Sequence, residues 1–184
     1  MALDLNAIRN KLNQPIQLGY CNLGVVIKSS SDEFREGDKV VSNGAHAEYV
    51  CVAENLCSKV PSNINDDTSA FTIIASIGLQ AVRITNPQIG DKVVVFGLGL
   101  IGLLTVQILL ANGCEVLGID KNDNRCNIAK SYGAKILNSS EDTNLISSVN
   151  NFSAGAGVDS VIIAASSKND EIIHYSAQFC RQRG

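Results

Sequence analysis

The sequence predicts an α/β protein in which a doubly wound parallel sheet follows a smaller β-rich segment. After residue 91, runs of Val and Ile without polar alternation recur, and a run with helical spacing follows each of them. Such strands are typical of a parallel sheet covered by helices on both faces. The composition agrees with a folded domain, since 45% of the 184 residues are hydrophobic and the net charge is only −3.

Residues 1–60 are expected to form part of a small barrel after one early helix. The stretch LDLNAIRNKL places apolar residues on one helical face, and Pro15 follows it as a stop. Short β-type runs separated by turns come next, which is typical of small barrels. We expect them at residues 23–27, 39–41, 47–52 and 56–60.

Residues 61–90 are expected to link the two parts of the chain. Either Asn65 or Asp66 can cap a short helix there, and residues 75–84 have the spacing of a second helix. Residues 91–184 then alternate strand and helix. Strands are expected at 92–96, 115–119, 135–137 and 158–164, and helices at 101–112, 124–132, 143–150 and 170–181.

Three glycines between the first of these strands and its helix form a G-x-G-x-x-G pattern. Gly97 permits a tight turn, Gly99 lets a pyrophosphate approach the backbone, and Gly102 lets the helix pack close to the strand. The helix begins near Leu100 and Ile101, so its free N–H groups face the phosphates. The pattern indicates a dinucleotide site, although glycines that serve packing alone give the same spacing.

An acid at the end of the next strand predicts which dinucleotide is bound. The carboxylate of Asp120 can accept hydrogen bonds from the ribose hydroxyls and would repel a 2′-phosphate, which favours NAD over NADP. Lys121 and Arg125 are cations close to the same position and weaken this preference. All three are expected to contact the cofactor.

Several further stretches stand in the order of a known family. They are PIQLGYCNLGVV, REGDKVV, GAHAEYVCV, AENLCSKVP, SAFTIIASIGLQAV, GDKVVVFGLGLIGLLTVQILLANGCEVLGID and GVDSVIIAAS. Together they resemble the medium-chain dehydrogenase/reductase superfamily, which includes the zinc alcohol dehydrogenases. NKLNQPIQLGY is most similar to a bacterial subgroup whose module precedes a second dehydrogenase domain.

The resemblance implies a partial GroES-like barrel in residues 1–60, linking helices in 61–90 and a Rossmann domain in 91–184. Four strands in the order 3-2-1-4 would be present, with the chain cut at both ends relative to the family. Residues 164–166, beginning with Ala164, would lie beside the ribose of the cofactor. The strand at 158–164 would be an exposed apolar edge through which copies of the chain pair.

The family's zinc-ligand positions carry other residues here. Tyr20 and Cys21 stand where the family has a His and a Glu, and Thr72 or Ile73 stands at the third ligand position. We therefore expect no zinc. Tyr20 is a candidate proton donor in place of the metal, or a ring that only packs against the cofactor. His46 has no second ligand at metal spacing and is expected at the surface.

Other properties exclude several functional classes. No basic run favours nucleic acid, and the apolar stretch 93–111 is broken by glycines, so a membrane span is not expected. The six cysteines form no C-x-x-C pair, which indicates reduced thiols and a cytoplasmic protein. The amino-terminal residues lack the apolar core of a signal peptide.

These features predict an NAD(P)-dependent oxidoreductase of the medium-chain family. It would transfer hydride to or from a carbonyl or alcohol carbon of a small, sugar-related molecule, without catalytic zinc. The enzyme would be the full-length protein, and the 184-residue chain alone would be inactive. Three alternatives stay open: a dinucleotide-binding module without catalysis, a quinone or enoyl reductase, and a zinc enzyme with unusual ligands.

Overall fold

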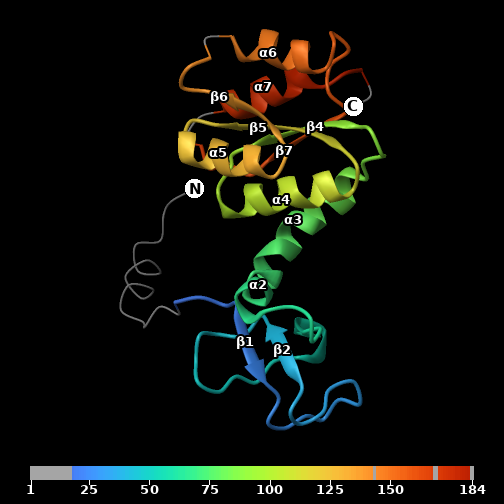
Figure 1. Ribbon diagram of the computed structural model, residues 1–184, viewed down its shortest axis with the longest axis vertical. Coiled ribbons are helices and arrows are strands. Elements are labelled where there is room, and N and C mark those ends of the chain that lie inside the picture. The colour runs from blue at the N-terminus through green and yellow to red at the C-terminus, as the bar shows by residue number, and fades with distance from the viewer. Residues whose placement is uncertain (1–17, 143, 168–169, 183–184) are drawn as a thin grey trace, which may run out of the picture. The chain divides into compact units, whose positions relative to one another are not determined.

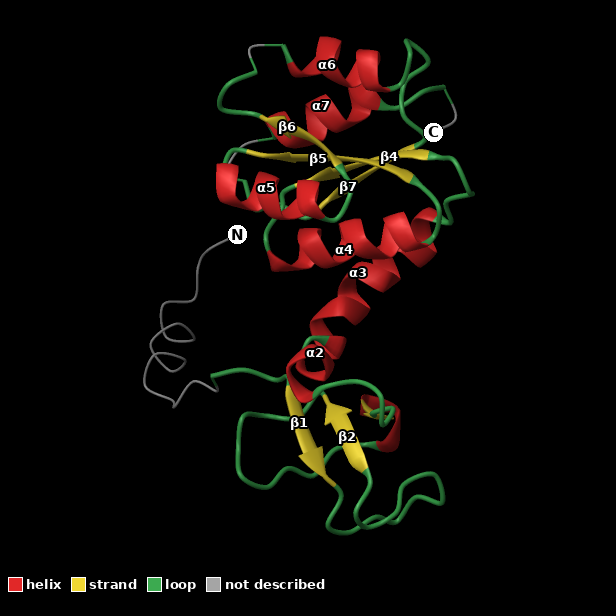
Figure 2. Ribbon diagram, viewed as in Figure 1, coloured by secondary structure: helices red, strands yellow, loops and turns green. Residues whose placement is uncertain are grey.

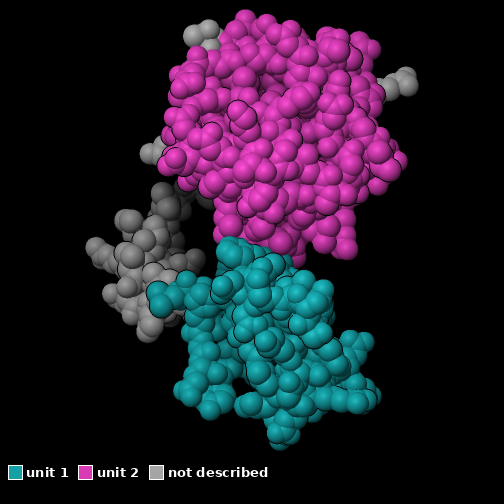
Figure 3. All heavy atoms as spheres, in the orientation of Figure 1, with its two compact units in different colours: residues 1–73 teal, residues 74–184 magenta. Residues whose placement is uncertain are grey.

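The computed structural model describes residues 18–142, 144–167 and 170–182, so the early helix expected before Pro15 lies outside the described residues. The chain forms two compact units, residues 1–73 and 74–184 (Figure 3). The three-part division at residues 60 and 90 stays a prediction. Each unit is described by itself below.

The first unit contains a three-stranded antiparallel sheet, which Figure 2 shows in part. Its strands are β1 (Asn22–Val25), β2 (Lys39–Ser42) and β3 (Cys57–Lys59), in the order β1-β2-β3. The 3-10 turn η1 (Glu54–Leu56) precedes β3, and helix α2 (Asp66–Ala70) follows it. The side chain of Asn65 caps α2 by accepting a hydrogen bond from the N–H of Thr68 at 2.7 Å. Three of the four expected strands and the predicted cap are present.

The prediction of a strand at residues 47–52 is wrong. No described residue pairs with this segment as a strand, and most of its side chains are exposed. The backbone just before it accepts and donates other hydrogen bonds: Asn22 donates its side-chain N–H to the carbonyl of Ala45, and His46 donates its backbone N–H to the carbonyl of Gly19. The β-type residues predicted a strand, but a strand also needs a neighbour with free hydrogen-bonding groups.

Helix α3 (Thr72–Thr85) begins before the boundary between the units at residue 74 and ends after it. After α3, the second unit alternates strand and helix as expected. Its sheet is parallel with the order β6-β5-β4-β7, which matches the predicted 3-2-1-4. The strands are β4 (Lys92–Phe96), β5 (Glu115–Asp120), β6 (Lys135–Asn138) and β7 (Ser160–Ile163). The helices are α4 (Leu100–Ala111), α5 (Asp123–Ser131), α6 (Leu145–Phe152) and α7 (Glu171–Phe179).

Helices cover both faces of this sheet (Figure 1). Alternate residues of β4 face opposite sides, so Val93 and Val95 pack with α4 and α5, whereas Val94 and Phe96 pack with α6 and α7. The three valines are fully buried. The unalternated run of β4 is explained by this double burial.

One side chain fixes the amino ends of β4 and β7. The carboxylate of Asp159 accepts a hydrogen bond from the backbone N–H of Lys92 at 2.7 Å and one from Nε of Arg181 at 2.6 Å. Val158 also forms a parallel bridge with Cys180, so residues 180–181 cover the beginning of the sheet edge that was expected to be open. The carboxyl ends of all four strands meet at the opposite edge, where the glycine turn lies.

Candidate functional site

Two of the three glycines are required by the packing of the protein itself. Gly97 has φ +97°, and a Cβ at this position would lie within 2.8 Å of three atoms of Ala165, which follows β7. A Cβ on Gly102 would collide with the carbonyl oxygen of Gly97. These glycines therefore allow the turn to close against β7 and allow α4 to start against the turn.

Gly99 is different, because nothing in the described structure demands a glycine there. Its φ of −66° and ψ of −174° are accessible to any residue, and a Cβ would meet no atom within 4 Å. Neither backbone strain nor packing explains this residue. A ligand group that approaches the backbone closely does explain it, as expected for a pyrophosphate at this turn.

The start of α4 offers free hydrogen-bond donors. Gly99 is the N-cap and carries no side-chain cap, and the first helical hydrogen bond runs from the N–H of Leu103 to the carbonyl of Gly99. The N–H groups of Leu100, Ile101 and Gly102 precede this bond and have no partner within the helix. With no acidic residue in the first turn, the helix dipole favours an anion here.

Asp120 lies at the carboxyl end of β5, beside this turn. It is only 7% exposed, and its Oδ2 accepts a hydrogen bond from the N–H of Leu98 at 2.7 Å. Its Oδ1 accepts one from the N–H of Asn122 at 2.9 Å, and Nη1 of Arg125 lies 3.6 Å from Oδ2. Each carboxylate oxygen has a second lone pair, so Asp120 can still accept bonds from ribose hydroxyls.

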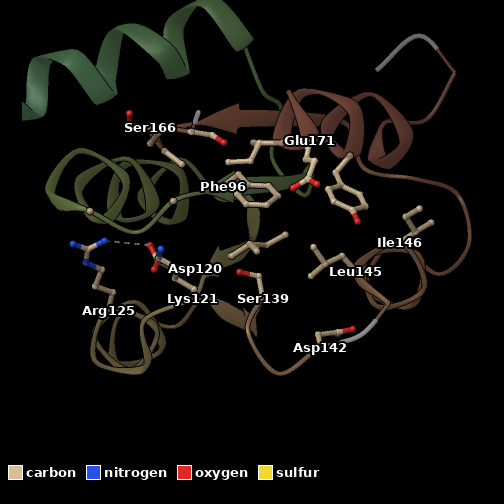
Figure 4. A pocket seen from close by; sticks show the side chains of 18 of the residues that line it. Phe96, Asp120, Lys121, Arg125, Ser139, Asp142, Leu145, Ile146, Ser166 and Glu171 are labelled. Atoms are coloured by element: carbon tan, nitrogen blue, oxygen red, sulfur yellow. Dashed lines mark ion pairs between the residues drawn. The ribbon is translucent and has the colours of Figure 1, made fainter. Parts of the chain in front are cut away.

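A cavity of about 600 Å³ lies at this edge of the sheet (Figure 4). Six of the predicted cofactor residues line it: Gly97, Gly99, Asp120, Lys121, Arg125 and Ala164. The other three, Leu100, Ile101 and Gly102, form the first turn of α4, next to Gly99, and do not line the cavity. The binding roles of all nine residues stay predictions. The carboxylate in this cavity and the free N–H groups next to it are the kinds of group that a dinucleotide needs.

The cavity wall also contains residues that the sequence motifs did not point to. They follow β6 and β7 and include Ser139, Asp142, Leu145, Ile146, Glu171 and Tyr175. The glycine pattern concerns only the first strand of the sheet and its helix. The signal that could have found the others is topological, since the carboxyl ends of parallel strands meet at one edge.

Tyr20 belongs to the other compact unit and is 47% exposed. Its role as a proton donor stays a prediction. Next to it, burial raises the pKa of the Cys21 thiol. The exposed His46 ring lies over Gly19, and its Nε2 is 2.9 Å from the carbonyl oxygen of Cys21.

Two residues at the family's zinc positions offer donors that are unusual for this metal. Zinc sites in proteins use Cys, His and carboxylates, whereas Tyr20 and Thr72 offer hydroxyl groups. Within residues 18–142, 144–167 and 170–182, no group of three or more His, Cys, Asp or Glu could hold a metal ion. All six cysteines are free thiols. Over the same residues, no helix has the length and apolar character needed to cross a membrane.

Comparison with known proteins identifies the family of the chain. The family model described as zinc-binding dehydrogenase matches residues 101–184. The chain is 32% identical over 117 residues to (R,R)-butanediol dehydrogenase of Bacillus subtilis, covering 63% of this chain and 34% of that protein. It is 30% identical over 152 residues to D-guloside 3-dehydrogenase of Escherichia coli, covering 79% of this chain and 43% of that protein. The chain belongs to the medium-chain dehydrogenase/reductase superfamily.

The fold of this superfamily is also found in solved structures. The 2R,3R-butanediol dehydrogenase from Bacillus subtilis matches with a TM-score of 0.75 and 24% identity, covering 86% of this chain and 54% of that one. The predicted fold class is therefore confirmed: a Rossmann sheet preceded by part of a GroES-like barrel. This medium-chain dehydrogenase/reductase chain spans 34% and 43% of the length of the two curated relatives.

Proposed function

We propose that this chain supplies the dinucleotide site of an NAD(P)-dependent oxidoreductase that prefers NAD. The observation that carries the proposal is Gly99, a glycine that neither backbone conformation nor packing requires, placed at the uncapped start of α4. The buried carboxylate of Asp120 beside the same cavity supports it. The names of the relatives, which are dehydrogenases, also support it.

Each part of the site has a distinct task in this proposal. The free N–H groups of Leu100, Ile101 and Gly102 hold the pyrophosphate. The second lone pairs of Asp120 accept the ribose hydroxyls, and its charge repels a 2′-phosphate. Arg125 already pairs with Asp120, so less of its charge is available to attract that phosphate. When bound, the nicotinamide supplies the hydride acceptor or donor.

The proposed reaction is hydride transfer to or from a carbonyl or alcohol carbon of a small, sugar-related molecule. The relatives named butanediol dehydrogenase and guloside dehydrogenase support this substrate class. We propose that no zinc takes part, because Tyr20 and Thr72 are poor zinc donors, and that Tyr20 donates the proton. Because the chain spans less than half of each relative, we expect the full-length protein to catalyse the reaction. We also propose that it does so in the cytoplasm.

Two measurements separate this proposal from its alternatives. If the full protein turns over an alcohol or an aldehyde, it is not a module that binds the dinucleotide without catalysis. If it turns over only a quinone or an enoyl substrate, the result favours a quinone or enoyl reductase. Metal analysis of protein purified without chelator tests the zinc enzyme with unusual ligands. One zinc per chain would overturn the zinc-free mechanism but leave the dinucleotide site intact.

The dinucleotide site itself is tested by titration with NADH and NADPH, followed by nicotinamide fluorescence. We expect NADH to bind more tightly, and Gly99→Ala to weaken binding about tenfold, since a methyl group would stand where the phosphates approach. Gly24→Ala is the matched control, because a Cβ at Gly24 in β1 also meets no atom within 4 Å. No binding of either nucleotide, or equal effects of both variants, would contradict the proposal.

A further inference from the structure

The cavity continues past Asp120 into a space between α6 and α7. In Figure 4, Asp120 and Arg125 lie on one side of Phe96, and Glu171, Leu145 and Ile146 lie beyond it. This inference rests on the proposed function, which places the phosphates at the start of α4 and the ribose at Asp120. The part of a dinucleotide attached to the other side of that ribose is its base, so the base occupies this space.

The wall of this space contains two aromatic rings and two aliphatic side chains. Phe96, at the end of β4, is buried, and Tyr175 on α7 is half-buried and stacks on Phe179 with ring centroids 6.0 Å apart. Leu145 and Ile146 come from the first turn of α6. Such walls suit a flat heteroaromatic ring, which gains by leaving water and by contact with aromatic and aliphatic faces.

Glu171 is the acid in this wall whose carboxylate is free to bind a ligand. Three acids line the cavity, and two of them already have partners. Asp120 accepts two backbone N–H groups, and Asp142 accepts the N–H of Asn144 at 2.7 Å and the hydroxyl of Ser148 at 2.5 Å. Glu171 has no hydrogen bond or ion pair with any residue that the structure describes. It reaches from the first turn of α7 toward the ring of Phe96 (Figure 4).

A carboxylate can only accept hydrogen bonds, so it selects a ring that carries a donor. It would repel a phosphate, which agrees with the phosphates lying at the other end of the cavity. We propose that Glu171 accepts a hydrogen bond from the 6-amino group of adenine and thereby selects the base of the dinucleotide. The aromatic and aliphatic wall would hold any flat base, and Glu171 would distinguish adenine from a base that carries no donor at that position.

The test compares NADH with reduced nicotinamide purine dinucleotide, in which a hydrogen replaces the 6-amino group of the base. Both compounds keep the same fluorescent nicotinamide, ribose and phosphates. We expect the wild-type protein to bind NADH about tenfold more tightly, because the unsubstituted purine has no donor for the carboxylate. In Glu171→Gln the charge is lost and the side-chain amide can donate to ring nitrogen N1 of both compounds, so the ratio should fall to within about twofold.

Glu115→Gln is the matched control. Glu115 is an exposed acid at the opposite end of the sheet, where it pairs with Lys135 at 3.5 Å, and its variant should keep the tenfold ratio. Equal binding of the two compounds to wild type, or an unchanged ratio in Glu171→Gln, would overturn the role of Glu171 and leave the dinucleotide site standing. If neither compound binds, the proposed function fails, and this inference fails with it.

Discussion

Asp120 accepts a hydrogen bond from the backbone N–H of Leu98 at 2.7 Å and thereby fastens the glycine turn to the end of β5. Its other oxygen holds the N–H of Asn122, at the start of the next loop. The residue expected only to contact the ribose is thus also a structural tie between two loops. Substitutions of Asp120 must separate these two roles before they can report on cofactor preference.

Asp120→Asn removes the charge but keeps a side-chain oxygen that can accept the bond from Leu98. We expect NADH to bind less tightly and the NADH-to-NADPH affinity ratio to shift about tenfold toward NADPH, because a 2′-phosphate no longer meets a carboxylate and Arg125 loses its partner. Asp120→Ala should in addition lower the free energy of unfolding by about 1–3 kcal/mol, since both backbone donors lose their acceptor. Titration and urea unfolding check the two effects. An unchanged ratio in the Asn variant would remove Asp120 from the ribose site.

The three glycines should respond differently to alanine. Gly102→Ala should destabilise the protein by at least about 1–3 kcal/mol, because the added methyl group meets the carbonyl of Gly97. Gly97→Ala should also destabilise it, through its positive φ and the contact with Ala165. Gly99→Ala should change the free energy of unfolding by no more than about 0.5 kcal/mol. Urea unfolding measures all three, and a large loss in Gly99→Ala would mean that packing does require this glycine.

The hydrogen bonds that Asp159 accepts from Lys92 and Arg181 predict a loss of stability in acid. Burial acts to raise the pKa of this carboxyl, but the hydrogen bonds from the Lys92 N–H and from Arg181 outweigh it, so the pKa lies below its usual value. A lowered folded-state pKa stabilises the protein above the unfolded pKa of about 3.9, and this contribution is lost as the pH falls through the folded value. Asp159→Asn should cost about 1–2 kcal/mol at pH 7. The free energy of unfolding of this variant should then fall less than that of wild type below about pH 4. If the free energy of both proteins falls by the same amount over this pH range, the prediction is contradicted.

The edge of the four-stranded sheet predicts self-association. Ile163 in β7 is 42% exposed, and the described residues place no strand beside it, although residues 180–181 cover the beginning of this edge. We propose that copies of the chain pair here, and we expect sedimentation to show association that increases with concentration. Ile163→Lys should abolish it, because a charge on an edge strand blocks pairing. Ile173→Lys on α7 is the control, since Ile173 is 62% exposed but lies outside the sheet. A wild-type monomer at high concentration would refute the pairing.

The second unit was predictable because its local signals agree with its packing. The apolar run of β4, the glycine spacing and the acid ending β5 each follow from double burial or from the turn. The strand order, which is confirmed, was implied by the resemblance to the family and not by these local signals. The segment 47–52 shows the limit, because its β-type residues could not reveal that no strand among the described residues would pair with it. Glu171 could not be found either, since the space it faces is formed by residues distant in the sequence.

The contact between Gly97 and Ala165 indicates that the turn is already formed in the free protein. Because the loop after β4 touches the loop after β7, the proposed phosphate site does not have to be assembled when a ligand binds. Association then loses little conformational freedom of the backbone, and the free and occupied loops should superimpose closely. Substitutions around this site should therefore change the dissociation rate of the ligand more than its association rate.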